Sequence, residues 1–449
     1  MMKKLFKYTL LFFIGLLLVI FTYLYITFPP IMSGMAAKTM CSCVFVLGRS
    51  PESVVEKELS VFPGLNRATI EIIDSSAVTA RILWSTKKAI FRKGLGCTLL
   101  SERSEEEVRT QKIILAVPPD KRADAFDSSA VLNSGVMQAI DEAFFEENPE
   151  RPKNTLAILV VFEGQIVGEK YANGFDQKSR FSGWSMTKSL TNALVGILVK
   201  EGKLRLDQPA PVTEWQNDER KQITLNNLMQ ASSGLDWNES YSTPGAFHNM
   251  FIHSDDKGGY AATKKLRYPP GEVFQYSSGT TNLVSKIIRQ TVGDSAYYRF
   301  PYEKLFYKIG MHRALLEPDA SGTFVASSYG YGSARDWARF GLLFLNDGVW
   351  IGERILPEGW VTYSTTPAAS APIGQYGAHW WLNAGAKDNL EQSYHPGLPQ
   401  DEFGAEGFEE QFIYVMPSKK LIVVRMGISH HGFDDVGLVQ KITSALSEK

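Results

Sequence analysis

The chain has 449 residues, with 47 Lys and Arg against 48 Asp and Glu. This balance gives no charge excess that would indicate nucleic acid as a partner. Aromatic residues make up 12% and charged residues 21% of the chain, which is typical of folded proteins and excludes a largely disordered one. The length is sufficient for more than one domain and a large buried core.

An uncharged apolar run at residues 8–28 is long enough to cross a bilayer of about 30 Å as a helix. Residues 1–7 carry Lys3, Lys4 and Lys7, which predicts a cytoplasmic N-terminus and an outer, periplasmic or extracellular location for the remainder. A cleaved signal peptide is the competing interpretation. The run is longer than a usual signal h-region and ends without a small-x-small cleavage site, so we expect a single-pass membrane protein.

Residues 37–117 are expected to form a small β-rich module that has a packing or spacing role. Residues 69–73 and 78–84 are strand-like and flank an Asp-Ser-Ser turn, and residues 88–92 continue the pattern. The charge-rich residues 101–111 are interpreted as a solvated face or connection.

The cysteines are Cys41, Cys43 and Cys97. An exported location allows a disulfide, in which Cys97 pairs with Cys41 or with Cys43 and leaves one free thiol. The alternative is that all of them are buried, reduced thiols. No fourth ligand has zinc-site spacing, so no metal site is expected.

A larger domain is predicted for residues 128–449. Two apolar strands separated by Glu163-Gly164 form a hairpin signal near its start, and two more strands lie near its end. This pattern predicts an α/β (α+β) fold, in which an antiparallel sheet built from both termini is flanked by helices and accompanied by a helical subdomain. The strands are expected at 155–162, 165–171, 411–415 and 421–426, and the helices at 131–145, 186–200, 281–290, after Ser333 and at 436–446, with a long insertion at 204–268.

Ser185 and Lys188 open the helix at 186–200, which we expect to be buried on one side. Residues three apart share a helix face, and a helix N-terminus leaves backbone N–H groups unpaired. A nucleophile, a base and a site for developing negative charge therefore meet within one turn, as acyl transfer requires. The alternative is that Ser185 is only an N-cap.

The same Ser-x-x-Lys pattern occurs at Ser85 and at Ser254. Ser85 lies on a strand-like run, where residues three apart point to opposite faces, and Ser254 lies in a polar loop. The chain has no Gly-x-Ser-x-Gly elbow, and its histidines lack the spacing of a helical metal pair. Tyr276 follows a Pro-Gly turn and precedes a helix; a core or surface aromatic is the alternative interpretation for it.

From about residue 128 to the C-terminus the chain resembles the serine β-lactamase/penicillin-binding protein family, specifically its class C-like branch. The resemblance implies a β-lactamase/transpeptidase-like fold. It rests on Ser185-Met186-Thr187-Lys188, Leu228 to Leu235, Tyr276-Ser277-Ser278, Ser333 to Gly341 and Phe403 to Phe408, which follow the family's order.

Two departures from the family pattern concern the substrate. Ala405-Glu406-Gly407 lacks the Lys or His of the third motif, and Glu406 would repel an anionic substrate if it pointed into the site. Ser278 replaces an Asn that often binds the substrate amide. Both favour the carboxylesterases and 6-aminohexanoate-dimer hydrolases of the family over an efficient β-lactamase.

The resemblance implies a serine hydrolase in which Ser185 attacks an ester or amide and Lys188 and Tyr276 share the proton transfers. The apolar run at 8–28 adds the expectation that this hydrolase is anchored in a membrane. Which of the two is the base is left open. The N–H groups of Ser185 and Phe408 are expected to hold the oxyanion. The residues expected to contact the substrate are Ser278, Glu406, Gly407, Tyr241, Trp237 and Phe247.

The partners expected are a small-molecule ester, amide or peptide substrate and a membrane bound through the N-terminal helix; oligomeric state is left open. No metal or organic cofactor is implied. The competing functions are a non-catalytic penicillin-binding-like envelope protein and a D,D-peptidase or weak β-lactamase. The outer location favours the D,D-peptidase, and the missing cationic third motif disfavours it.

Overall fold

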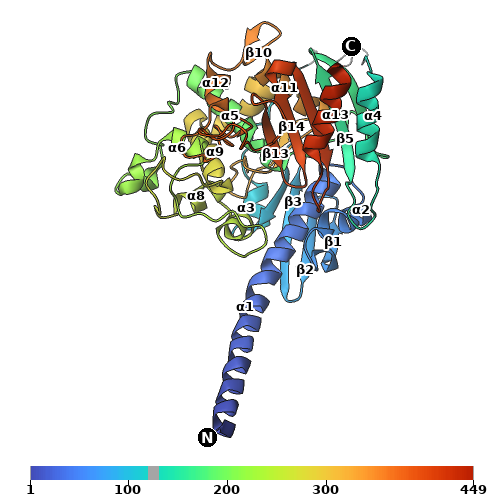
Figure 1. Ribbon diagram of the computed structural model, residues 1–449. Helices are drawn as coiled ribbons and strands as arrows, with labels where there is room; N and C mark the ends of the chain where they lie inside the picture. The colour runs from blue at the N-terminus through green and yellow to red at the C-terminus, as the bar shows by residue number, and fades with distance from the viewer. Residues whose placement is uncertain (1, 120–130, 448–449) are drawn as a thin grey trace.

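The computed structural model describes residues 2–119 and 131–447. The expected start of the larger domain at residue 128 therefore lies outside the described residues. Figure 1 shows a globular part from which one long helix projects.

The main sheet lies in the C-terminal part and is antiparallel. Within the described residues it has six strands, in the order β12-β13-β14-β15-β5-β6. Leu159 of β5 pairs with Val424 of β15, so strands from both ends of the larger domain lie side by side, as the sequence predicts. The bounds are β5 (Thr155–Phe162), β6 (Gln165–Tyr171), β12 (Trp381–Leu382), β13 (Phe403–Gly407), β14 (Gln411–Met416) and β15 (Leu421–Gly427).

The two faces of this sheet bury different sets of side chains because successive residues of a strand point to opposite sides. On β14, Phe412 and Tyr414 pack with α4 and α13, whereas Ile413 and Val415 pack with α11 and α5. Figure 1 shows α4 and α13 together on one side of the sheet. The bounds of these helices are α4 (Ser134–Phe144), α5 (Thr187–Lys200), α11 (Ala334–Leu345) and α13 (Asp435–Ser447).

A helical part occupies much of the chain between β6 and β12 (Figure 1). It contains α6 (Leu225–Met229), α7 (Ala246–His248), α8 (Lys257–Ala262), α9 (Ser278–Val292), α10 (Asp294–Tyr297) and α12 (Trp360–Thr365). Its short strands are β7 (Phe181–Ser182), β8 (Leu315–Leu316), β9 (Gly330–Gly332), β10 (Val349–Trp350) and β11 (Glu353–Arg354).

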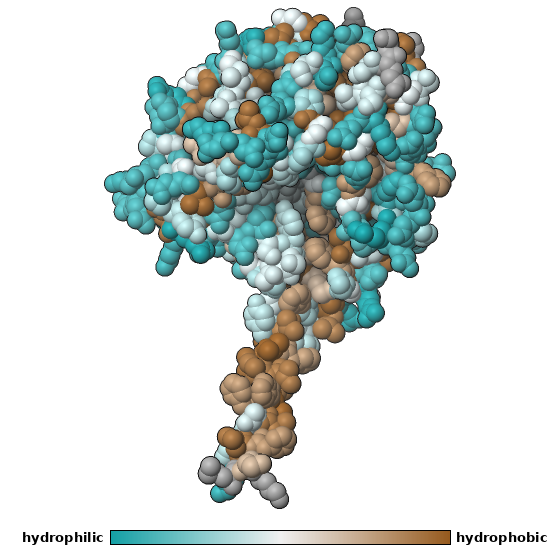
Figure 2. All heavy atoms as spheres, in the orientation of Figure 1, coloured by the Kyte–Doolittle hydropathy of each residue, from teal (hydrophilic) through white to brown (hydrophobic). Residues whose placement is uncertain are grey.

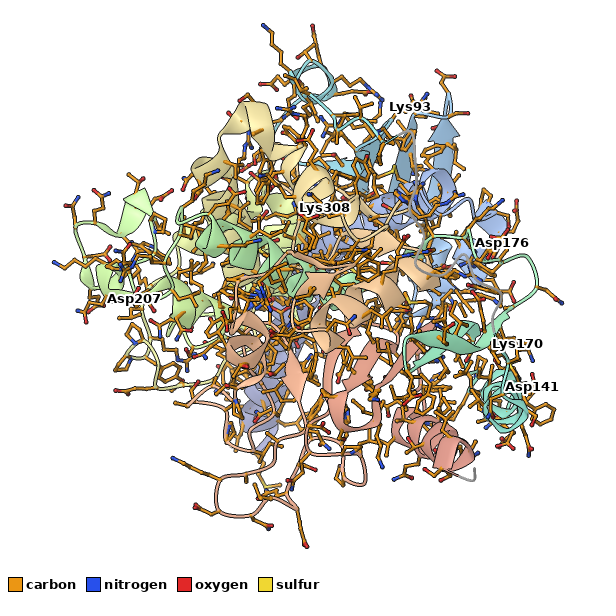
Figure 3. All side chains as sticks on the ribbon, turned by 90° about the horizontal axis from the view of Figure 1, so that it is seen from above. Lys93, Asp141, Lys170, Asp176, Asp207 and Lys308 are labelled. Atoms are coloured by element: carbon orange, nitrogen blue, oxygen red, sulfur yellow. A yellow bond between two sulfur atoms is a disulfide. The ribbon has the colours of Figure 1, made fainter. Side chains whose placement is uncertain are left out.

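The sequence-based expectation for α5 is wrong in one respect. We expected one buried side, but every residue from Thr187 to Leu198 is buried. The helical part covers the face that would otherwise meet solvent; for example, Asn192 donates a hydrogen bond to the carbonyl of Ala378 at 2.8 Å. Many of the charged pairs lie at the periphery instead, such as Asp141 and Lys170, 2.5 Å apart at one edge (Figure 3).

Helix α1 (Met2–Phe45) is much longer than the apolar run at 8–28, because it continues through Pro29 and Pro30. Pro29 has no N–H to donate to the carbonyl of Tyr25 four residues earlier. The indole Nε1 of Trp84 donates to that carbonyl at 2.9 Å instead. A donor from a distant hairpin thus satisfies the group that the proline leaves open.

A second antiparallel sheet, in the order β1-β2-β3-β4, packs against the C-terminal half of α1. Its strands are β1 (Thr69–Ile73), β2 (Ala77–Ile82), β3 (Ser85–Arg92) and β4 (Gly96–Leu100), and α2 (Pro51–Glu56) and α3 (Glu105–Arg109) flank it. The range 37–117 therefore begins with the last turns of α1 and contains short helices as well as strands. A disulfide joins Cys41 of α1 to Cys97 of β4, and Cys43 is a buried thiol.

Candidate active site

Ser185 lies in a sharp turn between β7 and α5. The turn is a 3₁₀ segment, Trp184–Met186, held at its start by a hydrogen bond from Gly183 N–H to the carbonyl of Gly330 at 2.8 Å. Trp184 has φ of 46°, a left-handed conformation that is costly for a side chain of this size. A β-carbon at Gly183 would lie 2.3 Å from the Trp337 ring, so the close packing requires glycine there.

Lys188 Nζ lies 2.9 Å from Ser185 Oγ. The amine also donates to Ser278 Oγ at 3.2 Å and to the backbone carbonyl of Ser327 at 2.9 Å. Burial lowers the pKa of Lys188 to about 8, against the opposing effect of the Glu239 carboxylate. Because the pKa is close to neutrality, a substantial fraction of this amine is unprotonated at physiological pH.

Glu239 is the residue of this site that the sequence analysis missed. Its carboxylate accepts hydrogen bonds from Ser278 Oγ at 2.5 Å and from Ser278 N–H at 2.9 Å. The indole Nε1 of Trp237 donates to it at 2.5 Å. Ser278 therefore connects Lys188 to a carboxylate, and the one sequence signal was that Glu239 stands between two aromatic residues already singled out, Trp237 and Tyr241.

Two tyrosine hydroxyls, those of Tyr276 and Tyr241, interact with the Ser185 side chain. The ring of Tyr276 also lies over Lys188 Nζ, 4.7 Å from its centroid, and stacks on Trp381 at 5.3 Å. Burial raises the pKa of Tyr276 well above its usual value, and the neighbouring Tyr376 and Tyr241 add to this effect. The phenol is therefore neutral at physiological pH.

Strand β13 runs beside the nucleophile turn. A β-carbon at Gly407 would lie 2.2 Å from the carbonyl of Gly183, so only glycine permits this approach. Phe408 follows directly, and its ring packs edge-to-face on Trp184 at 5.7 Å. Both Phe408 and Ser185 line the same cavity.

Glu406 lies on β13 but belongs to a separate polar cluster. Its Oε2 accepts a hydrogen bond from the Tyr394 hydroxyl at 3.1 Å, and its Oε1 lies 3.5 Å from His395 Nε2. Burial raises the pKa of Glu406 to about 8. At neutral pH the group is therefore largely protonated and offers neither the cationic anchor of the family's third motif nor a full negative charge.

The cavity over Ser185 has an empty volume of about 1270 Å³, counting the space that is open to solvent. Its wall includes Tyr241 and Phe247 from the insertion, and unexpectedly one face of α1. Trp237 is absent from the residues that line this cavity; its ring packs where a β-carbon on Gly279 would lie, so it positions Glu239 and α9. In the part of the chain that is described, no group of three or more His, Cys, Asp or Glu is arranged to hold a metal ion.

Comparison with known proteins shows which family this chain belongs to. A family model described as Beta-lactamase matches residues 142–442. A 6-aminohexanoate-dimer hydrolase from Paenarthrobacter ureafaciens is 27% identical over 262 residues, which cover 53% of this chain and 66% of that relative, just under two thirds of its length.

Two solved structures share the fold. A putative 6-aminohexanoate-dimer hydrolase from Bacillus anthracis has a TM-score of 0.59 at 23% identity, over 74% of this chain and 90% of that one. A family VIII carboxylesterase has a TM-score of 0.56 at 15% identity, over 71% of this chain and 99% of that one. The resemblance stated from the sequence motifs is therefore confirmed, and the chain belongs to the beta-lactamase family of serine hydrolases.

Proposed function

We propose that this protein is a membrane-anchored serine hydrolase that cleaves an ester or amide through an acyl-enzyme on Ser185. The observation that carries the proposal is the 2.9 Å contact between Lys188 Nζ and Ser185 Oγ, made by an amine whose pKa burial lowers to about 8. A buried amine that is partly unprotonated at neutral pH can accept the serine proton as the hydroxyl attacks.

In the first half of the reaction, Ser185 Oγ attacks the carbonyl carbon and its proton passes to Lys188. The carbon–heteroatom bond then breaks, and the leaving alcohol or amine takes up a proton. In the second half, water attacks the acyl-enzyme, the Ser185–acyl bond breaks and the carboxylic acid leaves. One water is consumed, and each proton taken from a nucleophile returns to a leaving group.

Lys188 is the general base of this proposal, and Tyr276 is the proton donor to the leaving group. The raised pKa of Tyr276 disfavours a tyrosinate and supports a neutral hydroxyl that donates. Ser278 and Glu239 act through Lys188. They hold the amine against Ser185, and the Glu239 carboxylate stabilises the positive charge of the amine after it has gained the proton.

The negative oxygen of the tetrahedral intermediate is proposed to lie between the N–H groups of Ser185 and Phe408. The first belongs to the unpaired N–H groups at the start of a helix. The second follows Gly407, whose contact with the Gly183 carbonyl brings the strand against the nucleophile turn. Loss of one such donor typically costs about 100- to 1,000-fold in turnover.

The proposed substrates are carboxylic esters or linear amides. The names of two relatives, a 6-aminohexanoate-dimer hydrolase and a carboxylesterase, support this class. Glu406 supports it too, because a largely protonated carboxyl cannot replace the cation that binds the carboxylate of a β-lactam or a cell-wall peptide. The weak β-lactamase and the D,D-peptidase are therefore not preferred.

Membrane anchoring rests on α1. Within the described residues it is the one helix that is long and apolar enough to cross a membrane, and its large apolar side chains between Leu5 and Ile26 are exposed. The lysines before the apolar stretch favour a cytoplasmic N-terminus. The catalytic part is proposed to lie on the outer side.

The decisive experiment compares Ser185→Ala with Ser254→Ala, a control that changes the serine of another Ser-x-x-Lys sequence. We expect Ser185→Ala to abolish hydrolysis of p-nitrophenyl butanoate and labelling by a fluorophosphonate, and Ser254→Ala to preserve both. If Ser185→Ala hydrolysed the ester at the wild-type rate, the assignment of Ser185 as the nucleophile would be wrong. Tight acylation of the wild type by penicillin would refute the substrate class, and failure of any serine-directed probe to label it would favour the non-catalytic alternative.

A further inference from the structure

Helix α1 has two different faces in its C-terminal half. Residues spaced three and four apart lie on one helix face, and the set with this spacing lines the cavity over Ser185: Met35, Lys38, Thr39, Ser42 and Cys43. The opposite face packs against the β1–β4 sheet through small side chains, including Ala36 and Ala37. The helix is thus the partition between that sheet and the active-site cavity.

Several contacts hold α1 in this place. The disulfide Cys41–Cys97 ties it to β4. Lys38 Nζ forms a buried ion pair with Glu317 of the hydrolase domain at 2.5 Å. Gly34, one turn before Lys38, permits a close approach to the insertion, since a β-carbon there would lie 2.7 Å from the side chain of Ile252. These contacts fix α1 in position, so the wall that it supplies is a permanent part of the cavity.

Among the charged side chains that line this cavity, Lys38, Arg49 and Glu58 form ion pairs. Burial raises the pKa of Glu409 well above its usual value, and Arg180 donates to the carbonyl of Arg313 at 2.8 Å. Besides its pairing with Glu317, Lys38 donates to Ser42 Oγ at 2.7 Å and lies over the Tyr329 ring at 3.7 Å. Arg49 pairs with Glu58 at 2.6 Å, and both side chains are nearly buried. Much of the remaining wall is aromatic or aliphatic: Phe62, Trp184, Phe247, Phe251, Ile252 and Phe408. Such a surface favours an uncharged apolar occupant.

The same helix leads to the membrane. Its exposed apolar part ends near Ile26, and Met35, nine residues later, lies roughly 14 Å further along the axis at 1.5 Å per residue. Beside Tyr25, the tip of the β2–β3 hairpin exposes Leu83 by 66% and Trp84 by 50%. An exposed tryptophan beside an apolar helix is typical of the membrane–water interface. Figure 2 shows the apolar surface of α1 continuing to the base of the globular part.

We infer that the substrate is a lipid with a long acyl chain, whose ester or amide carbonyl lies at Ser185 and whose chain occupies the cavity between α1 and the hydrolase domain. This inference rests on the proposed function and narrows its substrate class. The helix that enters the bilayer also forms the wall of the acyl site, so the site is held at a fixed, short distance from the lipid surface.

The first test measures kcat/KM of the full-length protein in detergent micelles for p-nitrophenyl esters from acetate to hexadecanoate. Each buried methylene adds about fourfold to binding, so we expect kcat/KM to increase at least about 100-fold between the butanoyl and dodecanoyl esters. A profile that is flat or falls beyond butanoate would overturn the acyl site but leave the serine hydrolase intact.

The second test fills the cavity from the α1 side. Thr39→Trp and, separately, Met35→Trp should lower the ratio of dodecanoyl to acetyl turnover at least about tenfold, because the indole occupies space needed by the chain. Thr22→Trp, in the exposed part of the same helix, is the matched control and should leave the ratio unchanged. Labelling of Ser185 by a small fluorophosphonate reports whether each variant is folded. If the labelled variants keep the wild-type ratio, the inference is wrong.

The third test separates a bilayer lipid from a free amphiphile. The full-length chain is reconstituted into phosphatidylcholine vesicles that contain a dodecanoyl ester of a membrane-retained alcohol, and compared with the same protein in micelles given a soluble dodecanoyl ester. Turnover in the vesicles supports the lipid source. Turnover of the soluble ester but not of the vesicle ester would overturn the assignment of a bilayer lipid as the substrate. If neither ester were hydrolysed and Ser185 were not labelled, the proposed function itself would be refuted.

Discussion

Glu239 Oε1 accepts a hydrogen bond from the Ser278 hydroxyl at 2.5 Å, and this contact joins the insertion to the first turn of α9. The same hydroxyl lies 3.2 Å from Lys188 Nζ. The Glu239 carboxylate is therefore linked to the Lys188 amine through the Ser278 hydroxyl. The carboxylate raises the pKa of Lys188, whereas burial lowers it by a larger amount. The balance between these two effects sets the pH at which the amine becomes a base.

Removing the negative charge of Glu239 is expected to shift the pH dependence of kcat/KM. Glu239→Gln removes a negative charge that favours the protonated amine, so the pKa of Lys188 should fall further. The midpoint of the acid limb of kcat/KM should move to lower pH by about one unit. The measurement is a pH–rate profile with a short p-nitrophenyl ester. Glu272→Gln, an exposed carboxylate near Tyr276, is the control, and an unchanged midpoint in Glu239→Gln would contradict the electrostatic role.

The wild-type profile itself tests Lys188 as the base. An amine must be unprotonated to accept the serine proton, so activity is lost as pH falls below its pKa of about 8. We expect kcat/KM to drop about tenfold per unit below that value and to level off above it.

Lys188→Met should remove the acid limb and lower kcat by about 100- to 10,000-fold. Lys203→Met, an exposed lysine beyond the end of α5, serves as the control. If Lys188→Met retained a titration with a midpoint near 8, another group would be the base.

Tyr276 and Tyr241 present a matched pair, because both hydroxyls interact with Ser185. If Tyr276 protonates the leaving group, Tyr276→Phe should lower kcat by about 100-fold for an alkyl ester and much less for a p-nitrophenyl ester, whose leaving group needs no proton. Tyr241→Phe should lower the two rates to a similar extent. Equal losses for both esters in Tyr276→Phe would argue against proton donation.

Much of the larger domain could be predicted from local signals. The hairpin Glu163-Gly164 between two apolar runs predicted 155–162 and 165–171, which are the bounds of β5 and β6. The Ser333 cap likewise preceded α11, where its side chain accepts a hydrogen bond from Asp336 N–H. These features depend on residues within a few positions of one another, so the sequence alone contains them.

The features that were missed depend on contacts between distant segments. The membrane helix was predicted to cover only the apolar run at 8–28, and nothing near Pro29 and Pro30 reveals that Trp84 donates to the carbonyl of Tyr25. Glu239 likewise carries no local motif, since its partner Ser278 is 39 residues away. The role of α1 in the cavity wall follows only from its packing between the β1–β4 sheet and the hydrolase domain.

The disulfide between α1 and β4 is expected to contribute strongly to stability. It links residues separated by 56 positions, and on the chain-entropy model a loop of that length is worth about 4 kcal/mol. Cys41→Ser combined with Cys97→Ser should therefore lower the thermal unfolding temperature of the full-length protein in detergent. Without this link α1 is held less firmly, so limited proteolysis of the double variant should cut near residues 46–50, directly after α1, faster than in the wild type. Cys43→Ser, which removes a buried thiol outside the disulfide, is the control. If the double variant and this control unfolded at the same temperature as the wild type, the disulfide would have no part in holding α1 against the β1–β4 sheet.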